Sequence, residues 1–481
     1  MATRTRRNVY TLPAGDLTLY WYGQAVTAMK ALPKSDARSW EYQGAVHGIA
    51  PVPSALTKYW AQCQHGSSFF LPWHRMYLLH FERIVAEHVV QLGGPNNWAL
   101  PYWNYSAAVV WRALPAAFRG AKLANGTSNP LFVAQRKASM NAGGGVGAKD
   151  VDLAPAMVAP GTTGSGGFFG GAAAGHFSGF FGELEGTVHN RIHVAVGGSV
   201  GWMSDPDLAA LDPIFWLHHA NIDRLWEVWL ARDPAHRNLT TPYWLTGVSF
   251  DFHNAIGTPV SMRTIDVLNL AAPALDYTYD DLTDPLAVVP IAVVGGIPGG
   301  TGPGGTTGGT GGLPPMNPLQ RDLVGATIAP VVLGAQVEHV DVPTPVTPLA
   351  FAQSVAPQGI APTGPPSQLI QQVMLQLENV TSSAQAPAYD VYVNVPNAED
   401  PTKHEDRFIG RAAMFGIPQA SSPSGQHGGG GQNFAFDITE LYRRLSDIGE
   451  VSTNNLRVSF VPVDADDTVQ VSVGRISLYF A

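Results

Sequence analysis

The chain of 481 residues lacks several features that define common classes of protein. It has one cysteine, Cys63, so no disulfide can form within the chain. Charged residues make up 14% of it and the formal net charge is -9, so it lacks the basic surface that a general nucleic-acid-binding protein needs. No apolar run reaches the roughly 18 residues of a membrane-spanning helix, so we expect no membrane span. Its N-terminus lacks the apolar core of a secretory signal, which predicts a cytoplasmic location and leaves export by a partner protein open.

Glycine and proline are abundant instead, with 52 and 38 residues, and two glycine-rich stretches stand out. Residues 141–175 are rich in glycine and alanine, which predicts a long mobile surface loop. Residues 295–315, GGIPGGTGPGGTTGGTGGLPP, are of low complexity and are predicted to form a flexible linker because they cannot form a core. We therefore divide the chain into residues 1–284, a linker 285–325 and residues 326–481.

Different secondary structures are predicted on the two sides of this linker. Residues 69–94 and 201–234 are predicted to contain helices, because the first stretch ends on two glycines and the second has Asp212 as an N-cap followed by Pro213. Beyond the linker, VMLQLENV, AYDVYVNV, LRVSFVPV and VQVSVGRISLYF alternate in polarity, which predicts strands, and ITELYRRLSDIG predicts one helix. The expected fold is a mainly α domain built as a helix bundle, followed by a smaller all-β, sandwich-like domain.

Fifteen histidines are too many for one site, but a few positions stand out. His189 and His193 are four residues apart, which on a helix places both rings on one face, a common way to hold a metal. Such a pair more often lies at the surface by chance, but here apolar residues flank it and another histidine-rich helix follows. His47, His65 and His74 are further candidates, although an isolated histidine is more often a structural core residue.

The sixth position is one of two adjacent histidines, His218 and His219, which a helix turns about 100° apart. Asp223 lies four residues after His219, where its carboxylate could orient a ligand ring or form a structural ion pair with an arginine. We therefore favour His219 as the ligand and expect His218 to pack beside the site or to bond a carbonyl group. Six imidazoles suggest two metal ions with three nitrogens each, and the spacing leaves copper, zinc, iron and nickel open.

Two longer motifs carry a family resemblance. HGSSFFLPWHRMYLLHFE, residues 65–82, and DPIFWLHHANID, residues 212–223, resemble the two copper signatures of the tyrosinase, polyphenol oxidase and haemocyanin family of paired-copper (type-3) proteins. The resemblance covers about residues 7–284. It implies a catalytic helix bundle that holds two copper ions and uses dioxygen as co-substrate. By the same resemblance, one ion would be held by His47, His65 and His74, and the other by His189, His193 and His219.

The resemblance also assigns roles to residues around these histidines. Cys63 would form a thioether to His65, where the simpler interpretation is a small buried apolar residue. Glu185 and Asn190 would hold a water that deprotonates phenols, where the simpler interpretations are a carboxylate at a helix start and a solvent-facing polar residue. Val194 would line the substrate entrance.

A tyrosine motif closes the catalytic domain in the family, and ALDYTYDDL resembles it. The resemblance places Tyr277 and Tyr279 in this motif. It implies a structural partnership with an arginine near the N-terminus, for which we take Arg7.

The C-terminal part is similar to the β-rich domain of plant polyphenol oxidases, which covers the copper site in latent forms. The segments that carry this likeness are AYDVYVNVP, FAFDITELYRRLSDIG and VSVGRISLYF. It implies an apolar side chain that fills the entrance. Met414 and Phe415 are the candidates for this plug, although each is also an ordinary residue for the interior of a strand.

The expected function is a latent tyrosinase, which hydroxylates monophenols at the ortho carbon and oxidises o-diphenols to o-quinones. A catechol oxidase or o-aminophenol oxidase without hydroxylase activity is the nearest alternative. A haemocyanin-like oxygen carrier and a zinc hydrolase represent other classes. The expected partner is a small phenolic substrate, with no nucleic acid and no membrane, and a homo-oligomer is left open. The sequence does not reveal the physiological phenol.

Overall fold

A computed structural model describes residues 4–177, 179–286, 321–344, 372–396, 398–423, 429–451, 455–464 and 468–480. The linker predicted at 295–315 lies outside these residues, so the domain boundaries stay predictions. Strand β5, Asp322–Ala326, begins inside the linker predicted at 285–325. No helix among the described residues is long and apolar enough to cross a membrane.

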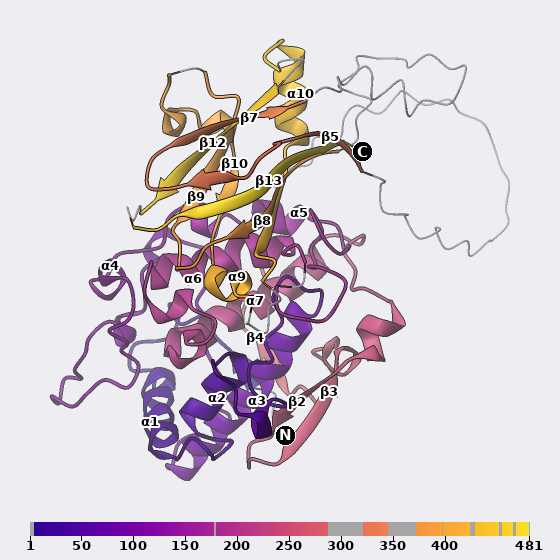
Figure 1. Cartoon of the computed structure of the whole chain (residues 1–481). Coiled ribbons are helices and arrows are strands. Elements are labelled where there is room, and N and C mark those ends of the chain that lie inside the picture. Colours follow the sequence, from indigo (N-terminus) through magenta and orange to yellow (C-terminus); the bar gives the residue numbers. More distant parts are fainter. Residues whose placement is uncertain are drawn as a thin grey trace, which may run out of the picture.

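Helices dominate the first part of the chain, which forms the lower body in Figure 1. The Asp212 side chain accepts the Ile214 N–H at 3.0 Å and Pro213 opens helix α7, so the predicted helix start is confirmed. α7 packs against α3, where the Phe81 ring stacks on the Trp216 ring. The main helices are α1 Thr18–Ala31, α2 Trp40–His47, α3 Phe70–Gln91, α6 Asn190–Gly197 and α7 Pro213–Arg232.

Two small strand pairs complete this helical part. β1, Arg4–Arg6, lies parallel to β4, Tyr277–Tyr279, and so joins the N-terminus to the end of the helical part. β2, Ser249–His253, and β3, Pro259–Arg263, form an antiparallel hairpin. The β1–β4 pair brings arginine and tyrosine side chains from opposite ends of this part of the chain into one place.

The C-terminal part consists of two antiparallel sheets that enclose a separate apolar core. One sheet has the order β10-β9-β12-β7, and the other has the order β11-β8-β13-β5, with β6 also paired to β13. The predicted strands correspond to β8 Val373–Thr381, β9 Ala388–Val393, β12 Asn455–Val463 and β13 Val471–Phe480, and the predicted helix to α10 Thr439–Asp447. The remaining strands are β6 Val331–Leu333, β7 Glu338–Pro343, β10 Phe408–Ala412 and β11 Gln432–Asp437. The predicted fold class, a helical domain with an all-β C-terminal domain, is confirmed.

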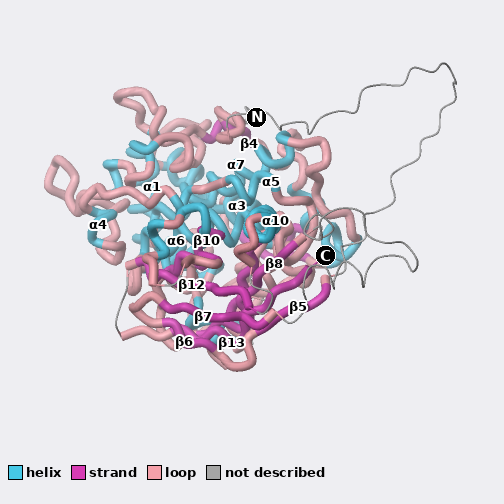
Figure 2. Tube along the Cα trace, turned by 90° about the horizontal axis from the view of Figure 1, so that it is seen from above, coloured by secondary structure: helices cyan, strands magenta, loops and turns pink. Residues whose placement is uncertain are grey.

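The sheets lie on one side of the helical part (Figures 1 and 2). The short helix α9, Ile417–Ser421, lies on the side of the sheets that faces the helices (Figure 1). Polar contacts hold the two parts together. Arg411 pairs with Asp150 at 2.5 Å, and the Gln419 amide donates to Asp205 at 2.7 Å. The β part therefore docks on the helical part through buried and half-buried polar pairs.

The glycine-rich stretch 141–175 is not the mobile surface loop that we predicted. It contains the short helix α5, Ala154–Val158, and it buries Met157, Phe168 and Phe169. The Phe168 ring stacks on the Trp229 ring of α7, with 3.8 Å between centroids. The prediction was wrong because a few apolar side chains among many glycines are enough to anchor the segment.

Candidate dicopper site

Three of the predicted ligands come together from three different elements. His47 is the last residue of α2, His74 lies one turn into α3, and His65 lies in the loop that precedes α3. Their ring centroids are 5.3 Å apart for His47 and His65, 5.3 Å for His65 and His74, and 5.6 Å for His47 and His74. All three side chains are buried, so their rings share one enclosed space.

The other three predicted ligands form a second group beside the first. His189 ends a single π-helical turn, Glu185–His189, His193 lies in α6, and His219 lies in α7. Ring centroids are 4.4 Å apart for His189 and His193, and 4.8 Å apart for His189 and His219. The groups face each other, because the His219 ring stacks on the His74 ring at 4.5 Å.

Hydrogen bonds on one ring nitrogen fix the orientation of these histidines. The Nδ1 atoms of His47, His74 and His193 lie 2.8, 2.8 and 2.6 Å from the carbonyl oxygens of Pro206, Phe70 and Met203. A carbonyl only accepts, so each Nδ1 carries the proton and donates, and Nε2 keeps its lone pair. The hydrogen bonds therefore aim Nε2 of each ring inward.

The inward nitrogens suit a metal ion. Within the described part of the chain, Nε2 of His47, His65, His74 and His189 is buried and has no hydrogen-bond partner. Burial lowers the pKa of His47 to about 4 and the pKa values of the other five rings well below their ordinary range. The rings are thus neutral, the form that binds copper, and unpaired buried nitrogens are explained if each one ligates a metal.

His218 and His219 both lie near the second group, and their surroundings differ. His219 Nε2 lies 3.2 Å from His193 Nε2, so these two nitrogens point at one spot. His218 Nδ1 lies 3.1 Å from the Tyr105 hydroxyl, and its ring centroid is 5.0 Å from that of His193. Geometry allows either ring to approach a metal, and the choice of His219 stays a prediction.

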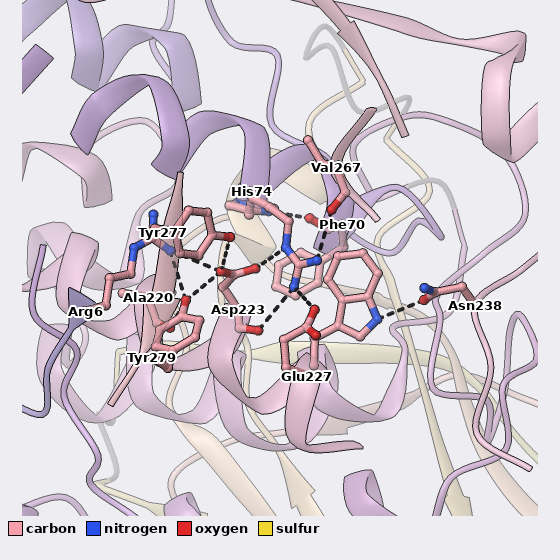
Figure 3. Close-up of polar contacts among 12 residues, drawn as sticks. Arg6, Phe70, His74, Ala220, Asp223, Glu227, Asn238, Val267, Tyr277 and Tyr279 are labelled. Atoms are coloured by element: carbon pink, nitrogen blue, oxygen red, sulfur yellow. Dashed lines mark hydrogen bonds and ion pairs between the residues drawn. The ribbon is translucent and has the colours of Figure 1, made fainter. Parts of the chain in front are cut away.

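Asp223 does not orient His219 but forms a structural ion pair, the second of the two roles considered for it (Figure 3). Its carboxylate accepts from Arg75 at 2.5 Å, from Arg6 at 3.1 Å, and from the hydroxyls of Tyr277 and Tyr279 at 2.8 and 2.5 Å. Burial raises the pKa of Asp223, but Arg75 and Arg6 outweigh burial and hold the pKa below its ordinary value. Asp223 therefore ties α7 to α3 and to the β1–β4 pair.

The arginine partner of the tyrosine motif is Arg6, and our choice of Arg7 was wrong. The Arg6 guanidinium lies 3.7 Å from the centroid of the Tyr277 ring and pairs with Glu82 at 2.5 Å. Arg7 is half-exposed and pairs with Asp16 at 2.7 Å. Side chains alternate along extended backbone, so Arg7, the residue that follows β1, points away from the side on which Arg6 lies.

Glu185 and Asn190, the two residues that the family resemblance assigned to water binding, both lie close to predicted ligands. Glu185 Oε1 accepts the Gly66 N–H at 2.9 Å, and Asn190 Oδ1 lies 2.8 Å from His189 Nδ1. Burial raises the pKa of Glu185 well above its ordinary value, although bonds from the Gly66 and Gly182 N–H groups oppose this. Glu185 Oε2 and Asn190 Nδ2 are buried without partners among the described residues. Each therefore keeps one polar atom that can bind water.

The C-terminal part reaches the histidines through Phe415. The Phe415 ring stacks on the His193 ring at 4.1 Å and lies 5.4 and 5.6 Å from those of His65 and His189. Met414, the other candidate plug, packs in the core of the C-terminal part. Val194 is 8% exposed and lines a cavity of about 290 Å³ between the two parts.

Cys63 is buried and its Sγ lies within 4.8 Å of ring nitrogens of His47 and His65. A residue that sequence reasoning missed lies beside it. His176 Nε2 is 3.5 Å from Cys63 Sγ and 2.6 Å from His65 Nδ1. His176 stands in a glycine-rich stretch without a motif, so only the fold could place it here.

The carbonyls of Met203 and Pro206 were also missed, because backbone acceptors leave no mark in sequence.

The buried imidazoles form two facing groups within a helix bundle, and their ring nitrogens lie close enough together to hold metal ions. A family model described as the common central domain of tyrosinase matches residues 37–153 and 170–232 of the chain. A second model, described as a domain of unknown function, matches residues 320–481. These two matches cover the helical and the β part separately.

Individual relatives extend this result. The chain is 35% identical to a tyrosinase of Hahella sp. over 508 aligned positions, which span 99% of each chain. It is 32% identical to a tyrosinase of Streptomyces glaucescens over 246 positions, which cover 46% of this chain and 77% of that one. The solved structure of latent apple tyrosinase superposes with a TM-score of 0.64 at 21% identity, covering 100% of this chain and 98% of that chain, so the two share a fold. The chain belongs to the tyrosinase family.

Proposed function

We propose that the chain is a tyrosinase, a dicopper enzyme that hydroxylates monophenols and oxidises o-diphenols to o-quinones, and that the β part keeps it latent. The stacking of Phe415 on His193 carries the proposal, because a phenol that approaches the predicted copper ligands from this side would have to displace the Phe415 ring. The name and full-length match of the Hahella relative support the activity. The latent apple structure supports the arrangement, since it is named as latent and shares the fold.

Two copper ions, held by His47, His65 and His74 and by His189, His193 and His219, would supply the binding and reduction of dioxygen. The chain's own groups do the rest. The carbonyls that fix Nδ1 hold the rings at one orientation, and the buried walls exclude bulk water, which strengthens polar interactions inside the site. Such orientation in advance lowers the cost of reaching the reactive geometry.

The unpaired polar atoms of Glu185 and Asn190 can hold a water molecule that accepts the proton of the phenol. A water between Glu185 Oε2 and Asn190 Nδ2 would take the phenol proton and pass it to the carboxylate. A carboxylate whose pKa is raised by burial is a stronger base than an exposed one. The phenolate then has the charge that favours its approach to the metal site.

Replacing Glu185 by Gln is expected to lower monophenol turnover by about 10²-fold or more, the usual contribution of a positioned base, because the amide cannot take the proton. The rate is measured on copper-loaded protein from which the C-terminal β part has been removed by cleavage in the predicted linker. Glu183→Gln is the matched control, since Glu183 lines the cavity between the two parts and not the histidine groups. Equal losses in both variants, or no loss at Glu185, would contradict the role.

Opening the site should not require removal of the β part if Phe415 is the plug. Phe415→Gly in the intact chain is expected to raise o-diphenol oxidation about tenfold or more, because a larger share of molecules has a free entrance. Met414→Gly, one residue away but in the β core, is the control and should leave latency in place. If Met414→Gly activates and Phe415→Gly does not, the plug is assigned to the wrong residue.

A catechol oxidase is the second candidate, and turnover of the trimmed chain on matched mono- and diphenols separates the two. Oxidation of the diphenol alone would identify a catechol oxidase. Reversible oxygen binding with no turnover of either would identify a carrier.

We also propose that Cys63 forms a thioether to a ring carbon of His65. The step breaks the S–H bond of Cys63 and one ring C–H bond of His65 and forms the S–C bond, while two electrons and two protons pass to dioxygen to give hydrogen peroxide. Copper-loaded, aerated protein is then expected to show no free thiol after denaturation, because Cys63 is the chain's sole cysteine. Peptide 59–75 should be lighter by two hydrogen atoms in mass spectrometry. One titratable thiol per chain and an unchanged peptide mass would contradict the bond.

A further inference from the structure

His65 differs from the other predicted ligands in what holds its second ring nitrogen. His47, His74 and His193 use backbone carbonyls, and His189 uses the Asn190 side chain. His65 Nδ1 instead lies 2.6 Å from Nε2 of His176. One ligand of the first group therefore depends on an imidazole from a distant part of the chain.

The direction of this hydrogen bond follows from the other nitrogen of His65. Its Nε2 is buried, has no protein partner among the described residues and lies with the rings of His47 and His74. If Nε2 offers its lone pair to a metal, Nδ1 must carry the proton and donate it to His176. The bond then fixes the tautomer and the plane of the His65 ring and increases the basicity of Nε2.

His176 is held in place by more than this one bond. His65 and His176 form a parallel β-bridge, and the Phe177 N–H donates to the His65 carbonyl at 2.7 Å. The Phe177 ring stacks on the His176 ring at 4.2 Å and on the His65 ring at 5.7 Å. The backbone pairing and the stacking together set the position of the His176 ring against His65.

We propose that His176 is a positioning residue for the copper ion held by His47, His65 and His74. It does not ligate that ion, but accepts the His65 Nδ1–H and thereby orients Nε2. The inference deepens the proposed dicopper function and rests on it. A thioether at a ring carbon of His65 would leave Nδ1 free to donate, so the two proposals are compatible. We expect no effect of His176 on the copper ion held by His189, His193 and His219.

The test is copper binding by the full-length apoprotein, titrated with copper ions against a competing chelator. His176→Leu removes the acceptor, and we expect one of the two copper affinities to fall about 10- to 100-fold while the other stays the same. At limiting copper the variant should hold one ion per chain and show the EPR signal of a lone Cu(II), which a magnetically coupled pair lacks. His176→Gln places an amide oxygen where Nε2 was. It should therefore restore binding of the copper ion held by His47, His65 and His74.

His236→Leu is the matched control. His236 is also a histidine of the helical part that stacks on an aromatic ring, and its Nδ1 lies 2.7 Å from the Trp229 carbonyl, away from the ligand groups. It should bind two ions like the unmodified chain. Far-ultraviolet circular dichroism of each variant checks that it is folded.

Each outcome decides one point. If the unmodified chain binds no copper pair, the proposed function fails and the role of His176 falls with it. If the unmodified chain binds two ions and His176→Leu binds both with unchanged affinity, only the role of His176 is overturned. If His176→Gln loses the ion as fully as His176→Leu, the loss does not come from the missing hydrogen-bond acceptor. The proposed role of His176 in positioning His65 is then overturned as well. Loss in His176→Leu with rescue in His176→Gln supports it.

Discussion

The His219→Ala chain is expected to bind one copper ion where the unmodified chain binds two, and to lose at least about 10³-fold of its oxygen uptake on a diphenol, since a catalytic metal contributes several kcal/mol. The reason is geometric. His219 Nε2 converges with His193 Nε2, and its ring stacks on His74 of the other group. Copper analysis after gel filtration gives the number of ions bound per chain, and an oxygen electrode gives the rate of oxygen uptake.

His218→Ala is the natural companion, because the two histidines are adjacent and equally buried. Its ring is turned toward the Tyr105 hydroxyl, so its loss should leave both copper ions bound. Some activity should be lost through poorer packing of α7. The opposite pattern, with copper lost from His218→Ala and kept by His219→Ala, would show that the wrong histidine of the pair was chosen.

Asp223→Asn is expected to lower the free energy of unfolding by about 3–5 kcal/mol, the usual cost of breaking a buried ion pair from one side. The substitution keeps the volume but leaves Arg6 and Arg75 buried with less negative charge to balance them. Urea unfolding followed by tryptophan fluorescence measures the change. Glu440→Gln, which removes the pairing of the exposed Glu440 side chain with the half-buried Arg443, should change the unfolding midpoint little.

The loss caused by Asp223→Asn should also depend on pH. The pKa of Asp223 is lower in the folded chain than in the unfolded chain, so its charge stabilises the fold at neutral pH. This contribution is lost as the pH falls through the lowered folded pKa. The difference between the variant and the unmodified chain should therefore shrink in acid. A small difference at neutral pH, or one that grows in acid, would contradict the assigned network.

Elements with strong local signals were predictable from sequence. The start of α7 is marked by Asp212 and Pro213, and the alternating segments of β8 and β13 are long enough to be read without a partner. The fourth-residue spacing of His189 and His193 likewise predicted two neighbouring rings, whose centroids lie 4.4 Å apart. These features depend on residues close together in the chain.

Features that depend on distant segments were not predictable. Short strands such as β6 carry too few residues to show alternation, and they are stabilised by pairing with β13. Arg6 and Arg7 differ by one position, and the register of β1 against β4 decides which one faces Asp223. His176 reaches His65 only because a bridge joins two loops that are far apart in the sequence. Such contacts arise from the tertiary fold, not from a local motif.

Oxygen uptake by the copper-loaded chain on a simple monophenol, before and after cleavage within residues 295–315, tests the proposed latent tyrosinase most directly. We predict little uptake by the intact chain, because Phe415 covers the histidines, and a strong rise after cleavage and removal of the β part. Equal uptake by both forms would contradict latency, and no uptake of oxygen with a monophenol by either form would contradict the hydroxylase itself.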